Sequence, residues 1–321
     1  EISACLVGSE MCIRDRNMIQ KDSPLVTIQC LTYNHEPYIR QCLEGFVMQQ
    51  TDFCFEVIVH DDASTDGTAN IIREYAEKYP NIIKPILERE NQWSKKDGSL
   101  ERIMNEHTHG KYIALCEGDD YWIDPYKLQK QVDIMENDEK VGFVYSAFNT
   151  VDVLGKLYVN DVSERNMKKS FSGDIFCELL NNNFPQTLTV CFRKDYWSDY
   201  LEQKFAGYDY SLFLFIAGKS LCYYLNEKTG CYRIHPTGIM QSGGVPRLWS
   251  NNAFLFAASC YYSGYFWRRS YSTDLRIRFC IIKRLIKIII RHNYSFKLNQ
   301  VLLFKILELM LKPVAKLVKK H

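Results

Sequence analysis

The sequence contains no two cysteines separated by two residues, although 12 cysteines occur among its 321 residues. This absence argues against a zinc ribbon and against a thioredoxin-like motif, because both depend on that spacing. Several cysteines lie within apolar runs, where a thiol behaves as a small core side chain: Cys30, Cys42, Cys116, Cys191 and Cys222. The irregular spacing therefore favours reduced, buried thiols over a disulfide framework.

The first sixteen residues lack the order of a signal peptide, which has a basic start followed by a sustained apolar run. The run from Cys5 to Arg16 can instead be back-translated into a transposase-type sequencing adapter. We therefore interpret residues 1–17 as adapter-derived, with a natural start near Met18. A disordered natural terminus is the alternative, and under either interpretation this segment contributes nothing to the predicted fold.

Charge is distributed unevenly along the chain. The net charge is +2, yet residues 268–321 hold 14 Lys or Arg against two acidic residues, which leaves an acidic remainder. From Arg276 onward Lys or Arg interrupts the apolar residues every few positions, and no stretch there reaches the roughly 18 uncharged residues needed to span a bilayer. We predict that residues 241–321 form a helical basic extension that binds an anionic membrane surface through 268–321, rather than nucleic acid. A helical lid and a dimer interface are the alternatives.

Apolar runs alternate with amphipathic helical stretches through the first half of the chain. Strands are predicted at 25–31, 55–59, 82–87, 112–116 and 141–146, and helices at 38–48, 71–79 and 100–107 and from Asp124. This βαβ order predicts an α/β fold with a mostly parallel central sheet flanked by helices. The second half is more mixed, with strands predicted at 187–192, 221–225 and 230–234 and a helix at 208–217.

Two groups of carboxylates directly follow predicted strands. Asp61 and Asp62 come after the run at 55–59, and Glu117, Asp119 and Asp120 come after the run at 112–116. Ligands of open α/β sheets bind at the carboxyl ends of strands, and closely spaced carboxylates are best tolerated beside a cation. Hard divalent ions such as Mg²⁺ and Mn²⁺ take oxygen ligands and bridge carboxylate to phosphate. A solvated acidic turn is the alternative for the second group taken alone.

In their order and spacing these segments resemble the family 2 glycosyltransferases with the GT-A fold, of the bacterial cell-envelope or polysaccharide type. The resemblance covers roughly residues 25–235. It depends on TYN after the first strand, on DDASTDGT after the second, and on GKYI followed by the acidic group EGDD. It implies a GT-A (Rossmann-like) domain over 18–240, with a nucleotide-binding half at 24–146 and an acceptor half at 147–240.

The resemblance also implies roles for individual residues. The nucleotide sugar would be bound by Thr32, Tyr33, Asn34, Glu36, Asp61, Asp62, Glu117 and Asp119. Asp62 is slightly favoured over Asp61 for the base and ribose. Asp119, Asp120 and His235 would hold Mn²⁺ or Mg²⁺, and Asp209 would be the catalytic base. Glu117 stands where the family has the first Asp of its DxD motif, so its contact, to sugar or to metal, stays open. A helix N-cap is the alternative role for Asp209.

The implied activity is that of a hexosyltransferase at the inner face of the plasma membrane, cytoplasmic and peripheral. It would transfer sugar from a nucleotide diphosphate sugar, UDP-sugar by family frequency, to a glycan or lipid-linked acceptor, with metal dependence and inversion. A sugar nucleotidyltransferase is one alternative, but such enzymes usually have a Gly-rich, basic phosphate loop where Thr32, Tyr33 and Asn34 stand. A non-catalytic nucleotide-sugar-binding protein is the other, and intact acidic residues argue against it.

Overall fold

The computed structural model describes residues 23–158, 161–203, 209–238, 258, 261 and 262. The strands are β1 (Val26–Thr32), β2 (Phe55–Asp61), β3 (Ile83–Leu87), β4 (Tyr112–Leu115), β5 (Tyr121–Trp122), β6 (Val141–Val151), β7 (Cys191–Arg193) and β8 (Leu221–Arg233). The α-helices are α2 (Ile39–Val47), α3 (Thr68–Lys78), α4 (Ser99–His107), α5 (Lys127–Asn137), α6 (Asp161–Met167), α7 (Phe176–Asn181), α8 (Lys194–Leu201) and α9 (Asp209–Lys219). Two short 3₁₀ helices, η1 (Trp93–Lys95) and η2 (Thr187–Thr189), lie in the connections.

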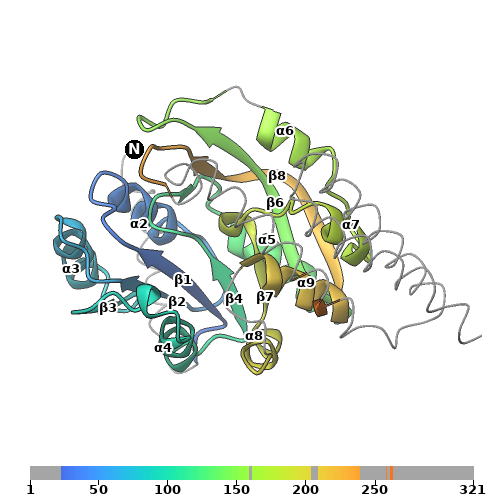
Figure 1. The fold of residues 1–321 in the computed structure, drawn as a ribbon, viewed down its shortest axis with the longest axis horizontal. Coiled ribbons are helices and arrows are strands. Elements are labelled where there is room, and N and C mark those ends of the chain that lie inside the picture. The colour runs from blue at the N-terminus through green and yellow to red at the C-terminus, as the bar shows by residue number, and fades with distance from the viewer. Residues whose placement is uncertain (1–22, 159–160, 204–208, 239–257, 259–260, 263–321) are drawn as a thin grey trace, which may run out of the picture.

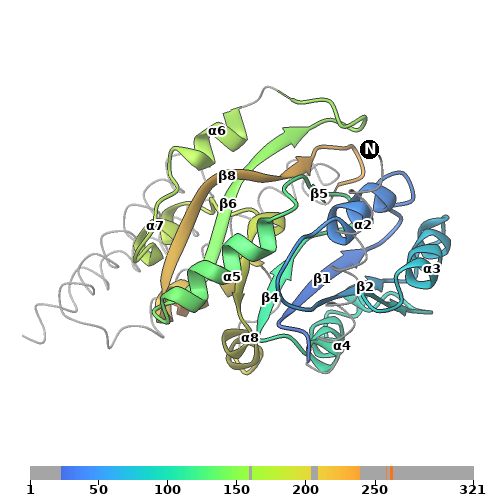
Figure 2. The ribbon, with the colours of Figure 1, turned by 180° about the vertical axis from the view of Figure 1, so that it is seen from behind.

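One mixed sheet runs through the molecule in the order β3-β2-β1-β4-β7-β6-β8-β5 (Figure 1). The pairs β3–β2, β2–β1, β1–β4 and β6–β8 are parallel, and β4–β7, β7–β6 and β8–β5 are antiparallel. The predicted α/β fold is therefore confirmed, with β7 entering against the direction of its neighbours. Helices α2 and α5 cover one face, and α4, α8 and α9 cover the other (Figures 1 and 2).

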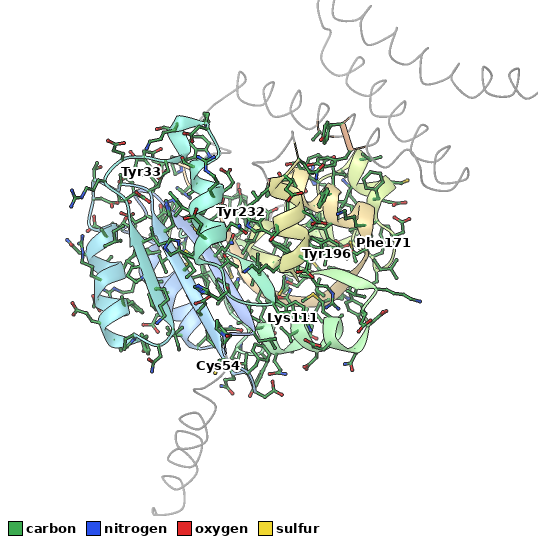
Figure 3. All side chains as sticks on the ribbon, turned by 90° about the horizontal axis from the view of Figure 1, so that it is seen from below. Tyr33, Cys54, Lys111, Phe171, Tyr196 and Tyr232 are labelled. Carbon is green, nitrogen blue, oxygen red and sulfur yellow. The ribbon has the colours of Figure 1, made fainter. Side chains whose placement is uncertain are left out.

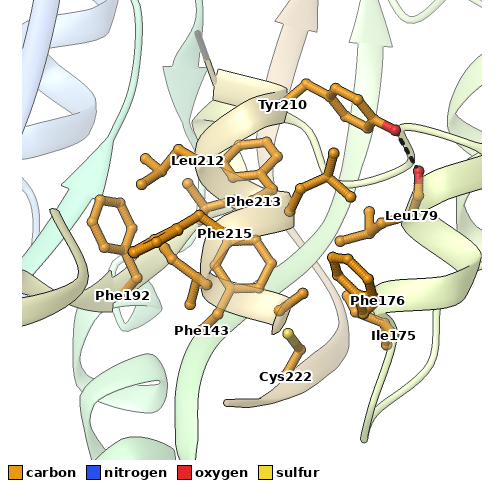
Figure 4. Packing of buried hydrophobic residues seen from close by; sticks show 14 of the residues in the cluster. Phe143, Ile175, Phe176, Leu179, Phe192, Tyr210, Leu212, Phe213, Phe215 and Cys222 are labelled. Carbon is orange, nitrogen blue, oxygen red and sulfur yellow. Dashed lines mark hydrogen bonds between the residues drawn. The ribbon is translucent and has the colours of Figure 1, made fainter. Parts of the chain in front are cut away.

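Two apolar clusters hold the helices on the sheet. One packs β1, β2 and β4 against α2, α3 and α5, and includes Ile28, Leu43 and Ile72. The other packs β6 and β7 against α7, α8 and α9, and includes Phe143 and Phe213 (Figure 4). Tyr33 lies on the half built around β1 and β2, whereas Phe171 and Tyr196 lie on the other half (Figure 3). Strand side chains alternate between the two faces, so each strand of the sheet can contribute to both clusters.

The five cysteines predicted to be core residues are all buried and free, which confirms that prediction. No helix in the described ranges is long and apolar enough to cross a membrane. The segment 1–17 lies outside the described residues, as does nearly all of the predicted extension at 241–321. Within that extension, Ala258 and Tyr262 are buried in the cluster around α9, and the Tyr262 ring lies 6.0 Å from that of Phe215.

Three predicted boundaries are wrong in the structure. The predicted strand at 187–192 is divided between η2 and β7, and the strands predicted at 221–225 and 230–234 are one strand, β8. Helix α5 begins at Lys127 rather than at Pro125. The Pro125 carbonyl accepts a hydrogen bond from the Gln50 amide (2.7 Å), and the Asp124 carbonyl accepts one from Gln49 Nε2 (2.8 Å). These bonds tie the segment before α5 to the loop after α2.

Candidate active site

The loops that follow β1 and β2 hold each other in place. Asn34 donates its amide to Ser64 Oγ and accepts the Thr65 amide at Oδ1, both at 2.8 Å. Glu36 accepts the Gly67 amide (2.9 Å) and donates its own amide to Asp66 (3.1 Å). Asn34 has φ of 55°, a left-handed conformation that Asn tolerates better than most residues. The structure thus places Asn34 and Glu36 at one edge of the sheet, beside the loop that begins with Asp61.

Asp61 and Asp62 use their carboxylates differently. Both oxygens of Asp62 accept backbone amides of the loop after β3, from Gln92 (2.6 Å) and Trp93 (3.1 Å). Asp61 accepts the hydroxyl of Ser64 (2.5 Å) and, more weakly, its amide (3.3 Å). Burial raises the pKa of Asp61, against the effect of the Ser64 hydrogen bonds. Asp62 therefore fixes a neighbouring loop, whereas the hydrogen bonds of Asp61 to Ser64 stay within its own loop.

The acidic segment, residues 117–120, runs beside the end of β1. Gly118 donates its amide to the Leu31 carbonyl (2.9 Å), which keeps the segment alongside the strand after β4 has ended. A Cβ added to Gly118 would lie 2.8 Å from Cβ of Thr32 and 3.0 Å from Nδ1 of His35. Only glycine permits this approach, because real Cβ atoms do not come so close to a neighbouring side chain. The approach brings Asp119 next to Thr32 and His35.

Asp119 is the centre of the acidic group. One oxygen each of Glu117, Asp119 and Asp120 lies within 4.8 Å of the others. Oδ2 of Asp119 is 2.9 Å from Nε2 of His235 and 3.7 Å from Nε2 of His35. Oδ1 of Asp119 is buried without a hydrogen-bond partner among the described residues. A buried carboxylate oxygen with free lone pairs, among further carboxylates and a histidine, is a donor set that suits Mn²⁺ or Mg²⁺.

The electrostatics of the group show a surplus of negative charge. Nearby protein atoms, together with the charges of Asp119 and Asp209, raise the pKa of the Glu117 carboxyl to about 8, although the residue is exposed. Burial, Asp119 and Glu117 raise the pKa of Asp120 well above its usual value. Burial acts in the same direction on Asp119, but the hydrogen bond to His235 and the charge of His35 leave the pKa of Asp119 lowered. A divalent cation would relieve the repulsion among these carboxylates.

Asp209 is the first residue of α9 and is exposed. Its Oδ2 accepts a hydrogen bond from Oγ1 of Thr187 (2.9 Å), and its Oδ1 accepts the amide of Tyr210 (2.6 Å). Its negative charge contributes to the raised pKa of Glu117. The remainder of α9 is buried and so fixes Asp209 at the end of a rigid helix. The structure therefore brings Asp209 and the acidic segment to the same part of the surface.

His235 follows β8 and is 3% exposed. Thr237 Oγ1 lies 2.9 Å from its Nδ1, which leaves Nε2 to face Asp119. Tyr33 is 45% exposed near the end of β1, and Oγ1 of Thr32 is buried without a partner in the described part of the chain. The predicted site residues thus gather at one edge of the sheet, from three strand ends, the start of α9 and the end of β8.

Sequence reasoning missed two residues of this site. His35 lies between the predicted residues Asn34 and Glu36, and burial lowers its pKa. Arg233 stands two positions before His235, a spacing that puts both side chains on one face of an extended strand. His35 could have been found because it lies within the turn that supplies Asn34 and Glu36, and Arg233 because it shares a strand face with His235.

A sheet that is parallel around β1, with two strand-end loops and a group of carboxylates suited to a divalent metal at one edge, has the arrangement of a nucleotide-binding α/β fold. The chain belongs to glycosyl transferase family 2, whose family model matches residues 28–198.

Individual similar proteins agree with this assignment. An uncharacterized protein of Mycobacterium tuberculosis is 34% identical over 238 residues, which are 73% of this chain and 66% of that relative. This chain thus spans just under two thirds of the relative's length. The fold is similar to that of S. aureus TarS 1–349 in complex with UDP (TM-score 0.57, 17% identity, 83% of this chain and 72% of TarS). It is also similar to the mannosyltransferase PcManGT of Pyrobaculum calidifontis in complex with GDP-Man and Mn²⁺ (TM-score 0.54, 15% identity, 99% and 92%).

Proposed function

We propose that this protein transfers a hexose from a nucleotide diphosphate sugar, a UDP-sugar, to a hydroxyl of a glycan or lipid-linked acceptor. The transfer depends on Mn²⁺ or Mg²⁺ and inverts the anomeric centre. The observation that carries the proposal is Asp119, which has one oxygen aligned with His235 and a second, buried oxygen without a partner. The Mn²⁺ and GDP-Man named for the similar mannosyltransferase structure and the UDP named for TarS support it.

The donor nucleotide would lie over the ends of β1 and β2. Its proposed ligands are Thr32, Tyr33, Asn34, Glu36, Asp61, Asp62, Glu117 and Asp119. For the base and ribose we now favour Asp61 over Asp62. The reason is that both Asp62 oxygens accept amides of another loop at 2.6 and 3.1 Å, whereas Asp61 is bonded only to Ser64 among the described hydrogen bonds of its side chain.

Asp119, Asp120 and His235 are the proposed metal ligands. His235 and Asp119 face each other at 2.9 Å, so a cation bound there would replace the proton that they share. When bound, the metal supplies a positive charge that stabilises the leaving diphosphate. Oδ1 of Asp120 accepts the Arg233 amide (2.8 Å), which fixes the direction of that carboxylate.

Asp209 is the proposed catalytic base. The acceptor oxygen attacks the anomeric carbon, the bond from that carbon to the diphosphate oxygen breaks, and the hydroxyl proton moves to the Asp209 carboxylate. The hydrogen bond from Thr187 (2.9 Å) orients the carboxylate. Inversion requires the acceptor oxygen to attack the anomeric carbon on the side opposite the leaving diphosphate, so Asp209 would lie across that carbon from the diphosphate.

The remaining proposals concern organisation in the cell. We propose a nucleotide-binding half at 24–146, an acceptor half at 147–240 and a basic extension at 241–321. The extension would bind the anionic inner face of the plasma membrane through 268–321, where 14 basic residues face only two acidic ones in sequence. A cytoplasmic, peripheral enzyme of polysaccharide biosynthesis would meet a lipid-linked acceptor there.

The function is tested by incubating the protein with several nucleotide sugars, Mn²⁺ and candidate acceptors. Release of nucleoside diphosphate supports the proposal, whereas release of pyrophosphate would indicate a nucleotidyltransferase. Asp209→Asn should lower the transfer rate about 10²- to 10⁴-fold while nucleotide binding persists. Asp133→Asn is the matched control, because Asp133 is an exposed carboxylate on α5 that bonds only Gln129 among the hydrogen bonds of the described residues. No turnover with any donor would contradict the proposal.

A further inference from the structure

We propose that Arg233 is a positioning residue that sets the geometry of the metal-binding carboxylates, an inference that depends on the function proposed above. Arg233 is the last residue of β8, and only 4% of it is exposed. A buried guanidinium is costly unless its donors are paired. Its partners show where the pairing is directed.

Two hydrogen bonds, both donated by Arg233, join it to the acidic segment. Its Nε donates to the backbone carbonyl of Asp119 (2.9 Å), and its backbone amide donates to Oδ1 of Asp120 (2.8 Å). In the first bond the Arg233 side chain donates to the backbone of the acidic segment. In the second the Arg233 backbone donates to a side chain of that segment. The pair of bonds fixes both the position of residues 119–120 and their rotation about the chain.

The outer end of the guanidinium is fixed to other elements. Nη2 donates to Oε1 of Gln41 on α2 (2.6 Å), and Nη1 donates to the carbonyls of Asp152 and Val153 (both 3.2 Å). The guanidinium carbon also lies 4.8 Å from the ring centre of Tyr38 and 5.3 Å from that of Tyr121. Four of the five N–H groups of arginine are thereby used, which only the planar, forked guanidinium allows.

Arg233 thereby links the two parts of the proposed metal site, the acidic segment and His235. His235 follows Arg233 by two residues, and Ile234 between them donates its amide to the Val151 carbonyl (2.9 Å), so the chain stays extended beside β6. Fixing Arg233 to the Asp119 carbonyl therefore fixes the separation of the His235 and Asp119 side chains, which is 2.9 Å. Arg233 itself does not touch the carboxylate of Asp119 in any described contact, so it acts through the backbone.

A purely structural role is the competing explanation, and the chain contains a matched control for it. Arg193 donates Nε to the Val141 carbonyl (3.0 Å), Nη1 to the Tyr112 hydroxyl (3.2 Å) and Nη2 to the Met135 carbonyl (2.5 Å). It also lies over the ring of Tyr112. Arg193 therefore makes the same kinds of contact at the opposite end of β4 from the acidic segment.

The test measures Mn²⁺ affinity by titration calorimetry in the full chain, together with the melting temperature of each variant. Arg233→Met and Arg233→Lys should weaken Mn²⁺ binding about 10- to 100-fold, the range found when groups behind metal ligands are removed. Arg193→Met should lower the melting temperature but leave the Mn²⁺ affinity of the folded protein unchanged. If both Arg233 variants fail to fold, Gln41→Ala, on an exposed helix position, replaces them and should weaken binding about two- to tenfold.

Folded Arg233 variants with wild-type Mn²⁺ affinity would overturn the inference, as would an equal loss in Arg193→Met. In those cases wild-type binding would still leave the proposed function standing. If the wild-type chain itself binds no Mn²⁺, the metal-dependent function fails, and the role of Arg233 fails with it.

Discussion

At the scale of single residues, the acidic group combines carboxyls whose pKa values are shifted in opposite directions. The pKa of Asp119 is lowered although the carboxyl is largely enclosed, because His235 and His35 favour its charged form. The pKa of Glu117 is raised to about 8 by the surrounding protein, Asp119 and Asp209. Asp119 is thus charged and ready to bind a cation at neutral pH, whereas Glu117 loses its proton most readily when a cation binds. This difference gives metal binding a definite pH dependence.

We expect Mn²⁺ affinity to rise with pH up to about 8, by as much as tenfold per unit for each proton released, because the ion displaces a proton from Glu117. The sign for stability follows from the same shift. In the metal-free protein the protonated carboxyl is favoured by folding, so its contribution to stability is present below the ordinary glutamate pKa of 4.5 and lost as pH rises through about 8. Calorimetric Mn²⁺ titrations from pH 6 to 9 should show a shallower dependence, by about one proton, in Glu117→Gln. An unchanged slope in that variant would show that Glu117 does not titrate on metal binding.

At the scale of elements, the runs of apolar residues predicted β1, β2, β4 and α9 well because each is buried along its length. The residues Asn226–Lys228 were predicted to separate two strands, since they are polar. In the structure β8 continues through them: Lys228 pairs with Ala147 of β6, and irregularities of register on either side of that pair accommodate the unpaired residues. Composition reports on side chains, whereas such pairing depends on a partner strand far away in sequence. The loop after β3 likewise depends on a partner distant in sequence, Asp62.

Asp62 shows how an element can depend on a residue with a predicted binding role. Because its two oxygens accept the amides of Gln92 and Trp93 at the start of η1, Asp62→Asn removes one of the acceptors. We expect that change to lower the free energy of unfolding by about 1–3 kcal/mol, measured by urea denaturation. Asp61→Asn should instead weaken UDP binding about tenfold or more, measured by calorimetry with Mn²⁺ present. The reverse pattern, with UDP affinity lost in Asp62→Asn alone, would return the base and ribose to Asp62.

At the scale of the whole molecule, sequence order could not give the sheet order. The parallel neighbours β1, β2 and β3 follow from short βαβ connections, which favour neighbouring strands, whereas β4 crosses back to pair with β1. Strand β7 begins 50 residues after the start of β6, yet it lies between β4 and β6 in the sheet. Its pairing with both strands joins the two halves of the sheet. The same closure brings Asp209 and His235 to the acidic segment, so their approach could be expected only from the resemblance to a known family. The charge asymmetry, in contrast, can be seen directly in the sequence.

That asymmetry predicts how the whole chain meets a membrane. Basic residues near an anionic bilayer contribute about 1 kcal/mol each, so replacing Lys319 and Lys320 with glutamine should weaken binding to phosphatidylglycerol vesicles about 30-fold. Raising the salt concentration should weaken the wild type as well, because salt screens such attraction. Replacing the exposed body lysines Lys84 and Lys140 is the matched control and should change little. Co-sedimentation with vesicles measures binding of all three proteins.

Equal binding to vesicles of phosphatidylcholine alone would exclude an electrostatic contact through residues 268–321. A concentration-dependent dimer that is lost in the Lys319 and Lys320 variant would assign this segment to an interface between subunits.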